Sequence, residues 1–302
     1  MTSATASTEQ RAQVGELELA YETIGDPSDP PLLLVMGLGM QLIHWQRELC
    51  ETLAQRGFYV IRFDNRDAGR STQINAPVPN LLRGFVGLRI DAPYRLEDMA
   101  ADTLGLLDRI GVERAHVVGA SMGGMIAQTL AIVAPQRVLS LGSIMSTTGA
   151  RNASRPKPHV WRMLLARAPR EREAYIEHFV RLFTLIGSPR YPADPAQLRE
   201  MAGITYDRGS HPAGTARQLA AIIASGDRTS RLRMLDVPAV VIHGREDPLV
   251  RFRGGEATAR AIPGARLVAF DGMGHDLPPE LWPEIVAALV ANTERAVTPQ
   301  AA

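Results

Sequence analysis

The chain of 302 residues holds a single cysteine, Cys50, and a single lysine, Lys157. One cysteine excludes an intrachain disulfide, so the fold needs no oxidising compartment. Cys50 lies in a helical apolar pattern over residues 44–57 and is expected to be a small core residue rather than a nucleophile. The 33 basic residues balance 32 acidic ones, and the net charge of +1 argues against a nucleic-acid partner.

Long apolar runs are also missing. No stretch approaches the ~18 apolar residues of a membrane span, so we expect no membrane partner. Residues 1–11 lack the basic start and apolar run of a secretory signal, and we therefore expect a cytoplasmic protein. Residues 1–11 and 297–302 are expected to be flexible tails. The sequence leaves the oligomeric state open.

Motifs for metals and cofactors are missing as well. No His, Cys, Asp and Glu residues stand at the spacing of zinc ligands, and both H-E-x-x-H and the phosphate-binding loop are absent from the sequence. The G-x-G of one predicted strand-to-helix turn, Gly37-Leu38-Gly39, lacks the third glycine of a dinucleotide fingerprint. We therefore expect no metal and no cofactor.

Apolar residues, 45% of the chain, occur in short segments that alternate between two periods. After an edge hairpin over residues 14–24, the pattern predicts buried strands at 31–36, 58–63, 114–118, 138–145, 237–242 and 266–270. It predicts helices at 44–55, 95–110, 125–133, 255–261 and 279–293. This order indicates an α/β fold with a doubly wound, mostly parallel sheet.

The alternation stops between residues 147 and 233, where only helices are predicted, at 159–167, 171–186, 194–202 and 214–225. We interpret this block as a helical cap inserted into a core formed by residues 12–146 and 234–296. The cap aromatics are expected mainly to pack the helices, and some of them to line a pocket with the apolar segment 81–88. These aromatics are Trp161, Tyr175, Phe179 and Phe183.

The segment Gly119-Ala120-Ser121-Met122-Gly123-Gly124 joins a predicted strand to a predicted helix. A G-x-S-x-G pattern in this context is typical of a nucleophile elbow, a sharp turn with the serine at its tip. The glycines let strand and helix approach closely while the serine adopts a strained backbone conformation. The start of the helix also directs its partial positive charge at the serine oxygen. Ser121 is therefore the candidate nucleophile.

A serine hydroxyl needs an adjacent base, and the base needs an acid to orient it. Among the seven histidines, His275 is the best candidate because it follows the strand 266–270 in a glycine-flanked loop. His243, which ends another strand, is its main rival. For the acid, Asp247 follows the strand 237–242 and precedes a proline that favours an extended conformation.

Two other carboxylates, Glu246 and Asp276, lie beside these loops, and Asp276 is a weak candidate because neighbouring side chains usually diverge. An acyl-transfer site also needs backbone N–H donors for the oxyanion. We expect one from Met122, directly after the nucleophile. We expect the other from Leu38, because the glycines on both sides leave its amide accessible.

Together these segments resemble the α/β-hydrolase family over nearly the whole chain. The motifs that carry the resemblance are Met36-Gly37, the D-x-R-x-x-G-x-S loop Asp64–Ser71, the elbow Gly119–Gly124, the G-x-x-D of Gly244–Asp247 and the histidine loop Gly272–His275. In that family the triad follows the order serine, acid, histidine. Met36-Gly37 and Asn65-Arg66-Asp67 also resemble the aclacinomycin methylesterase-like branch. Met36 replaces the family's usual histidine but leaves the backbone donor intact.

The resemblance implies a serine hydrolase that cleaves carboxylic esters of small, largely apolar molecules through an acyl-enzyme on Ser121. Asp64 and Arg66 are expected to be structural, bracing their loop through a buried or partly buried ion pair. The same triad also supports perhydrolase, lactonase, amidase or acyltransferase chemistry, and a ligand receptor with this fold is a further alternative. Dehalogenases and epoxide hydrolases are disfavoured because they carry an aspartate at the position of Ser121.

Overall fold

The computed structural model describes residues 9–81, 90–151, 153, 156–165 and 169–297. Its centre is an eight-stranded sheet with the order β1-β2-β4-β3-β5-β6-β7-β8. The first two strands form an antiparallel hairpin that joins β4, and the strands from β4 to β8 are parallel. The strands are β1 (Gln10–Val14), β2 (Leu17–Ile24), β3 (Pro31–Val35), β4 (Tyr59–Phe63), β5 (Ala115–Ala120), β6 (Val138–Ile144), β7 (Ala239–Gly244) and β8 (Arg266–Phe270).

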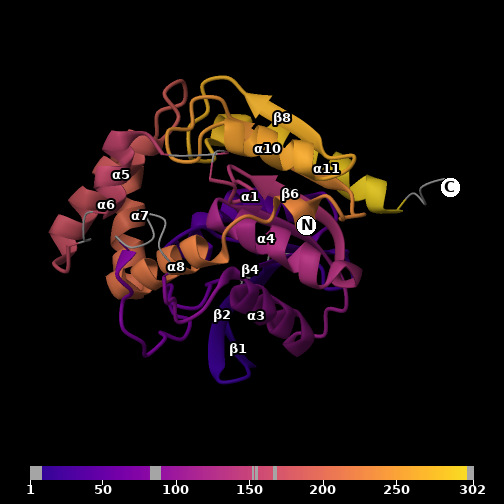
Figure 1. Cartoon of the computed structure of the whole chain (residues 1–302), viewed down its shortest axis with the longest axis horizontal. Coiled ribbons are helices and arrows are strands. Elements are labelled where there is room, and N and C mark those ends of the chain that lie inside the picture. Colours follow the sequence, from indigo (N-terminus) through magenta and orange to yellow (C-terminus); the bar gives the residue numbers. More distant parts are fainter. Residues whose placement is uncertain (1–8, 82–89, 152, 154–155, 166–168, 298–302) are drawn as a thin grey trace, which may run out of the picture.

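Helices cover both faces of this sheet, which confirms the predicted doubly wound α/β fold (Figure 1). One face packs on α3 (Leu96–Arg109), α4 (Met122–Val133) and α10 (Arg253–Ala261). The other face packs on α1 (Arg47–Gln55) and α11 (Trp282–Val297). Short 3₁₀ helices are formed by Leu42–His44, Pro135–Arg137 and Pro279–Leu281.

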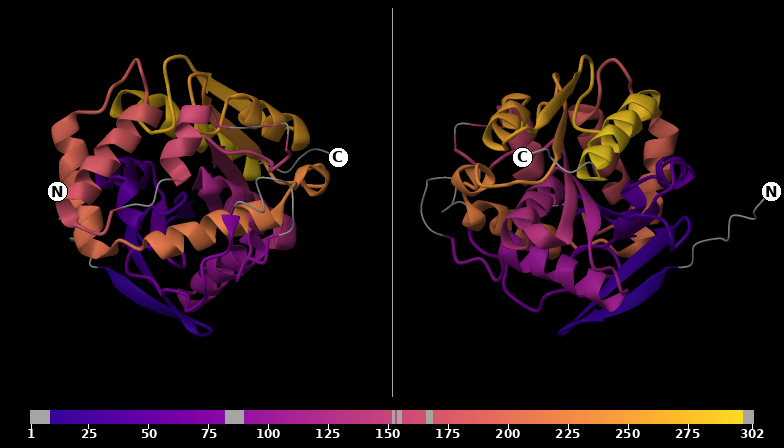
Figure 2. Two further views of the ribbon diagram at one scale, coloured as in Figure 1. Left: turned by 60° about the vertical axis from the view of Figure 1, so that its left-hand side comes forward. Right: turned by 90° about the vertical axis from the view of Figure 1, so that its right-hand side faces the viewer.

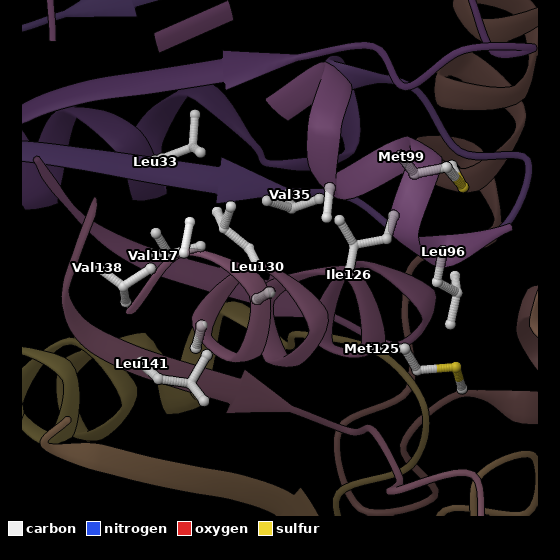
Figure 3. Packing of buried hydrophobic residues seen from close by; sticks show 14 of the residues in the cluster. Leu33, Val35, Leu96, Met99, Val117, Met125, Ile126, Leu130, Val138 and Leu141 are labelled. Atoms are coloured by element: carbon white, nitrogen blue, oxygen red, sulfur yellow. The ribbon is translucent and has the colours of Figure 1, made fainter. Parts of the chain in front are cut away.

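The core is densest where α4 lies on the sheet. Figure 3 shows Ile126 and Leu130 of α4 among Leu33, Val35 and Val117 of the central strands. These five side chains are fully buried. Because α4 is apolar around most of its circumference, it is buried against the sheet and its neighbours, and it stops just before Pro135. This packing fixes the N-terminus of α4, where Ser121 lies.

Between β6 and β7 the described residues form five helices, and helices α5 to α8 among them gather on one side of the molecule (Figure 1, left). We refer to them as the cap. The cap helices are α5 (Pro158–Leu165), α6 (Arg172–Ile186), α7 (Pro195–Gly209), α8 (Pro212–Ser225) and α9 (Thr229–Leu232). The division into domains at residues 147 and 233 stays a prediction.

Two predicted boundaries change at the ends of the chain. Gln10 and Arg11 pair with Tyr21 and Ala20, so the structure corrects the predicted tail 1–11 at its inner end. The hairpin that they join extends from the lower edge of the molecule in Figures 1 and 2. At the other end α11 continues to Val297, beyond the predicted limit of 293. Residues 1–8 and 298–302 of the predicted tails lie outside the described residues.

Candidate active site

Ser121 lies between β5 and α4, at the carboxyl edge of the parallel strands. Its backbone has φ 57° and ψ −119°, a conformation that residues other than glycine rarely adopt. The neighbouring residues must be glycines because there is no room for a Cβ atom at these positions. A Cβ on Gly119 would lie 2.1 Å from the Gly123 carbonyl oxygen, and one on Gly123 would lie 2.0 Å from the Val35 carbonyl oxygen. The turn thus has the strained, close-packed geometry predicted from the motif.

The structure brings Ser121 together with His275 and Asp247. The imidazole Nε2 of His275 lies 2.9 Å from the Ser121 Oγ, and its Nδ1 lies 2.7 Å from Oδ2 of Asp247. An ionised carboxylate only accepts, so it holds the proton on Nδ1 and leaves Nε2 free to accept the serine proton. The three side chains therefore form one continuous hydrogen-bonded chain from acid to hydroxyl.

Asp247 is held by its own loop. Its Oδ1 accepts hydrogen bonds from the N–H groups of Leu249 and Val250, at 2.9 and 2.8 Å. Burial raises the pKa of Asp247, but the charge of His275 and the hydrogen bonds from His243 and His275 outweigh it, and the net shift is downward. The carboxylate is thus kept ionised and fixed in one orientation.

The rival histidine has a different role. His243 is fully buried at the end of β7, where its Nε2 lies 2.6 Å from the Val250 carbonyl oxygen and 3.4 Å from Oδ2 of Asp247. A carbonyl oxygen only accepts hydrogen bonds, so Nε2 of His243 carries the proton. His243 therefore supports the acid, Asp247. Sequence reasoning missed this support, although the position of His243 four residues before Asp247 is a usable signal.

The rival acids do not contact the imidazole. Oε2 of Glu246 accepts the Gly272 N–H at 2.6 Å, which ties the acid loop to the histidine loop. The carboxylate of Asp276 accepts hydrogen bonds from both the backbone N–H and the hydroxyl of Ser188. Burial raises the pKa of Asp276 despite these bonds. The geometry favours Asp247 over both.

The two amides predicted to hold the oxyanion lie near the serine. Met122 is the first residue of α4, and an N–H at that position has no partner within a helix. Leu38 lies in a turn over residues 37–40 that follows β3, and a Cβ on Gly37 would lie 3.1 Å from the Ser121 Cβ and 3.6 Å from its Oγ. Both donors thus come from segments that flank the hydroxyl.

The loop after β4 has the structural role predicted for it. Within the loop, Asp64 accepts the Arg70 N–H at 2.9 Å. It also accepts the Leu42 N–H at 2.6 Å and lies 3.1 Å from the Arg208 guanidinium of cap helix α7. Arg66 instead forms a bidentate pair with Asp102 of α3, at 2.5 and 2.6 Å. The structural role holds, but the ion-pair partners are distant in sequence, and no local spacing could have identified them.

A cavity of about 1180 Å³ lies between the sheet edge and the cap, with Ser121 and His275 in its lining. Most of its wall is apolar, and five methionines contribute. They are Met36, Met40, Met125, Met145 and Met201. Methionine side chains are flexible and adapt to irregular apolar shapes. The site therefore opens into a large, largely apolar chamber.

The cap aromatics divide between two roles. Trp161, Phe179 and Phe183 line the cavity, while Tyr175 packs against Phe179 and Tyr206 between α6 and α7. The apolar segment 81–88, expected to line the pocket, lies outside the described residues from residue 82 onward. The part of the lining that can be assigned is thus shared between the sheet edge and the cap helices.

The described side chains do not support a cysteine nucleophile or a metal site. Cys50 is buried, and burial raises the pKa of its thiol to about 11, which suits a core residue and not a nucleophile. Among the residues that the structure describes, no group of three or more His, Cys, Asp or Glu side chains could hold a metal ion. None of the described helices is both long and apolar enough to cross a membrane.

Comparison with known proteins agrees with this geometry. A family model described as "alpha/beta hydrolase fold" matches residues 30–280. The chain is 30% identical over 304 residues to rhodomycin D methylesterase DauP of Streptomyces sp. (strain C5), which covers 93% of this chain and 96% of that relative. It is also 30% identical over 302 residues to rhodomycin D methylesterase DnrP of Streptomyces peucetius, with the same coverage.

A solved structure shows the same fold. The 2-hydroxy-6-oxo-6-phenylhexa-2,4-dienoate hydrolase of Rhodococcus sp. strain RHA1 superposes with a TM-score of 0.76, covering 96% of this chain and 99% of that one. The two sequences are 22% identical. The likeness therefore concerns the fold alone.

Proposed function

Since the chain belongs to the α/β-hydrolase family, we propose that it cleaves carboxylic esters of small, largely apolar molecules as a serine hydrolase, with Ser121, His275 and Asp247 as its triad. The fold and the relatives named as methylesterases support ester hydrolysis. The observation that carries the proposal is the hydrogen-bonded chain from Asp247 through His275 to Ser121 at the wall of an apolar cavity.

In the proposed mechanism the Ser121 oxygen attacks the ester carbonyl carbon while His275 Nε2 takes the serine proton. The carbonyl oxygen becomes an oxyanion that accepts hydrogen bonds from the Leu38 and Met122 N–H groups. His275 then gives its proton to the leaving alcohol as the C–O bond breaks. Asp247 holds the imidazole and stabilises its positive charge throughout.

Water completes the cycle. His275 takes a proton from a water molecule that attacks the acyl-enzyme, and the proton then returns to Ser121 as the carboxylic acid leaves. The atoms and protons of these steps are conserved without any redox partner or cofactor. The cap limits the access of bulk water to the charged intermediates and shapes the pocket.

The relatives suggest which side of the ester is large. Their names describe removal of a methyl group, so the alcohol that leaves is small and the acyl part is the bulky one. The cavity volume of about 1180 Å³ is large, since pockets for drug-sized ligands typically have volumes of ~300–1,000 Å³. Among the small-molecule esters proposed above, we therefore expect methyl esters in which the acid is the larger, largely apolar part to be the substrates. The location of the protein in the cell stays a prediction.

A screen of esters with graded acyl and alcohol size tests this function. Wild type should turn over methyl esters of bulky acids better than bulky-alcohol esters of acetate. Ser121→Ala should lower kcat by at least ~10³-fold while the protein stays folded, because the nucleophile is lost. Near-wild-type turnover in folded Ser121→Ala would exclude the mechanism, and one product per chain without turnover would favour the receptor alternative.

A further inference from the structure

Helix α8 of the cap binds the turn that carries the Leu38 amide. The Gly39 N–H donates to Oε1 of Gln218 over 2.8 Å, and Nε2 of the same side chain donates to the Arg66 carbonyl, also over 2.8 Å. Gln218 is fully buried. Because one partner is a donor and the other an acceptor, only one orientation of the amide satisfies both.

The turn itself is short and depends on Gly39. The Met40 N–H donates to the Gly37 carbonyl over 3.2 Å, and Gly39 has a φ of +68°, as the third residue of a type II turn requires. The peptide between Leu38 and Gly39 is the central one of this turn. Gln218 binds its N–H and so sets the plane of the peptide that adjoins the Leu38 N–H.

The helix and the turn are also in close steric contact. A Cβ on Gly39 would lie 2.7 Å from the Thr215 hydroxyl oxygen, one helical turn before Gln218. The turn therefore lies between Thr215 and Gln218 on one side and Ser121 on the other. Gln218 itself is outside the cavity lining, so it reaches the reaction only through the backbone.

We propose that Gln218 is a positioning residue for the oxyanion hole. It holds the Leu38–Gly39 peptide so that the Leu38 N–H points at the oxygen on which negative charge develops. The inference rests on the proposed serine-hydrolase function and extends it, because it assigns to the cap a role in the chemical step. An N–H donor that already points at the position of the oxyanion stabilises the transition state without any movement of the backbone. A donor on a mobile turn stabilises the transition state less.

The direct test is Gln218→Met, which keeps the length of the side chain and removes both hydrogen bonds. Losing a whole oxyanion donor costs about 10²–10³ in kcat, so a misaligned donor should cost about 10-fold or more. KM should stay within about 2-fold, since the ester in its ground state does not need the oxyanion donors. Inhibition by a trifluoromethyl ketone, whose serine adduct carries an oxyanion, should weaken by the same factor as kcat.

The matched control is Ser225→Ala on the same helix. The Ser225 hydroxyl accepts the Leu96 N–H at 2.9 Å, so this change also removes a bond from α8 to a backbone N–H of the core. That bond is remote from the turn, and kcat should remain at the wild-type level. An equal loss of kcat in both variants would show that α8 acts only through general stability, and the inference would be wrong.

A second variant keeps the inference testable if Gln218→Met does not fold. In Gln218→Glu, a protonated carboxyl can accept the Gly39 N–H and donate to the Arg66 carbonyl. An ionised carboxylate cannot donate, and its negative charge is repelled by the Arg66 carbonyl oxygen. The activity of the variant relative to wild type should therefore rise as the pH falls. A ratio that is independent of pH would contradict the positioning role.

The two proposals fail separately. Wild-type turnover that does not depend on Ser121 would overturn the serine mechanism and the inference with it. Turnover that depends on Ser121, with kcat and ketone inhibition unchanged in folded Gln218→Met, would overturn the inference alone.

Discussion

The two sides of the active-site cavity are built in different ways. On the sheet side, Ser121, Asp247 and His275 follow the ends of β5, β7 and β8, and the turns of Ser121 and Asp247 are shaped mainly by residues close in sequence. The His275 loop is the exception, because the His275 N–H donates to the Ile186 carbonyl of the cap over 2.7 Å. On the cap side, helices α7 and α8 are joined to the core by buried polar bonds between residues more than 100 positions apart. The first side depends on local backbone geometry, and the second on long-range pairing.

This difference assigns distinct tasks to the two sides. In the proposed mechanism the sheet edge supplies the groups that take part in bond making and breaking, while the cap bonds hold the loops around them. Two buried ion pairs anchor the cap, Arg208 with Asp64 and Arg217 with Asp67. Changes on the sheet side should therefore act mainly on catalysis, and changes in these two ion pairs mainly on stability.

The largest expected effect lies on the sheet side, at Asp247. Asp247→Asn keeps the shape of the side chain but favours the wrong tautomer of His275. In a serine protease the corresponding change lowers kcat by about 10⁴, and we expect a loss of that order in ester hydrolysis with little change in folding.

Glu246→Gln and Asp276→Asn are the controls for this change. Neither side chain contacts the imidazole, so each variant should lose far less activity than Asp247→Asn. A mild Asp247→Asn together with a severe Glu246→Gln would move the acid one residue back and leave the rest of the mechanism in place.

The same contrast decides what the sequence could predict. The succession of strands and helices, the elbow at Ser121 and the loop of His275 all have local signals, because glycines, β-branched runs and strand ends occur within a few residues of one another. The parallel sheet then brings the ends of its strands to one edge, so local signals are enough to assemble the triad. The sequence alone therefore predicts these features.

The bonds between the cap and the core had no such signal. Asp64 braces its own loop through the Arg70 N–H, as expected, but its ion-pair partner is Arg208, 144 residues later. Gln218 looks like any polar residue on an amphipathic helix, and only the packing of α8 on the turn shows its two bonds. Helix α7 also continues to Gly209, beyond the predicted end at residue 202. Pairings of this kind depend on tertiary packing and not on periodicity.

Breaking a cap anchor should cost stability. Arg217 binds Asp67 through two nitrogens, at 2.8 and 2.6 Å, with 7% and 0% of the two side chains exposed. Arg217→Met leaves the buried carboxylate without its cation, and we expect the free energy of unfolding to fall by about 3–5 kcal/mol in urea denaturation.

The control is an exposed ion pair within the cap. Arg172 pairs with Asp207, and these side chains are 48% and 58% exposed. Arg172→Met should change the unfolding free energy by less than about 1 kcal/mol. Equal costs for the two variants would mean that burial does not distinguish the anchor from an ordinary surface pair.

Acid should weaken both sides of the molecule. Burial lowers the pKa of His116, in β5, and of His44, beside Phe179 of the cap, to about 4 from an ordinary value of 6.5. Between these values the unfolded chain takes up protons that the folded chain does not, so stability present above pH 6.5 is lost as the pH falls toward 4.

Urea denaturation between pH 7 and 4.5 measures this effect. His116→Gln and His44→Gln should each make the decline with pH shallower than in wild type, because each removes one group that folding keeps neutral. A decline of unchanged slope in both variants would show that other groups control the acid response.

The smallest expected effect is that of metal removal. The side chains in the described part of the chain form no metal-binding cluster, and the proposed mechanism needs no Lewis acid. Ester hydrolysis should therefore be the same before and after dialysis against EDTA. Activity that is lost in the chelator and restored by one divalent metal would contradict this prediction.

Covalent labelling tests the central claim, that Ser121 is the nucleophile, most directly. A fluorophosphonate should add one group per chain by intact mass, and peptide mapping should place it on Ser121 and on none of the other 12 of the 13 serines. Pre-incubation with a slowly hydrolysed ester should protect the site, and Ser121→Ala should not be labelled. A stoichiometric adduct on another residue of an active preparation, or full ester turnover with Ser121 unmodified by excess probe, would contradict the account.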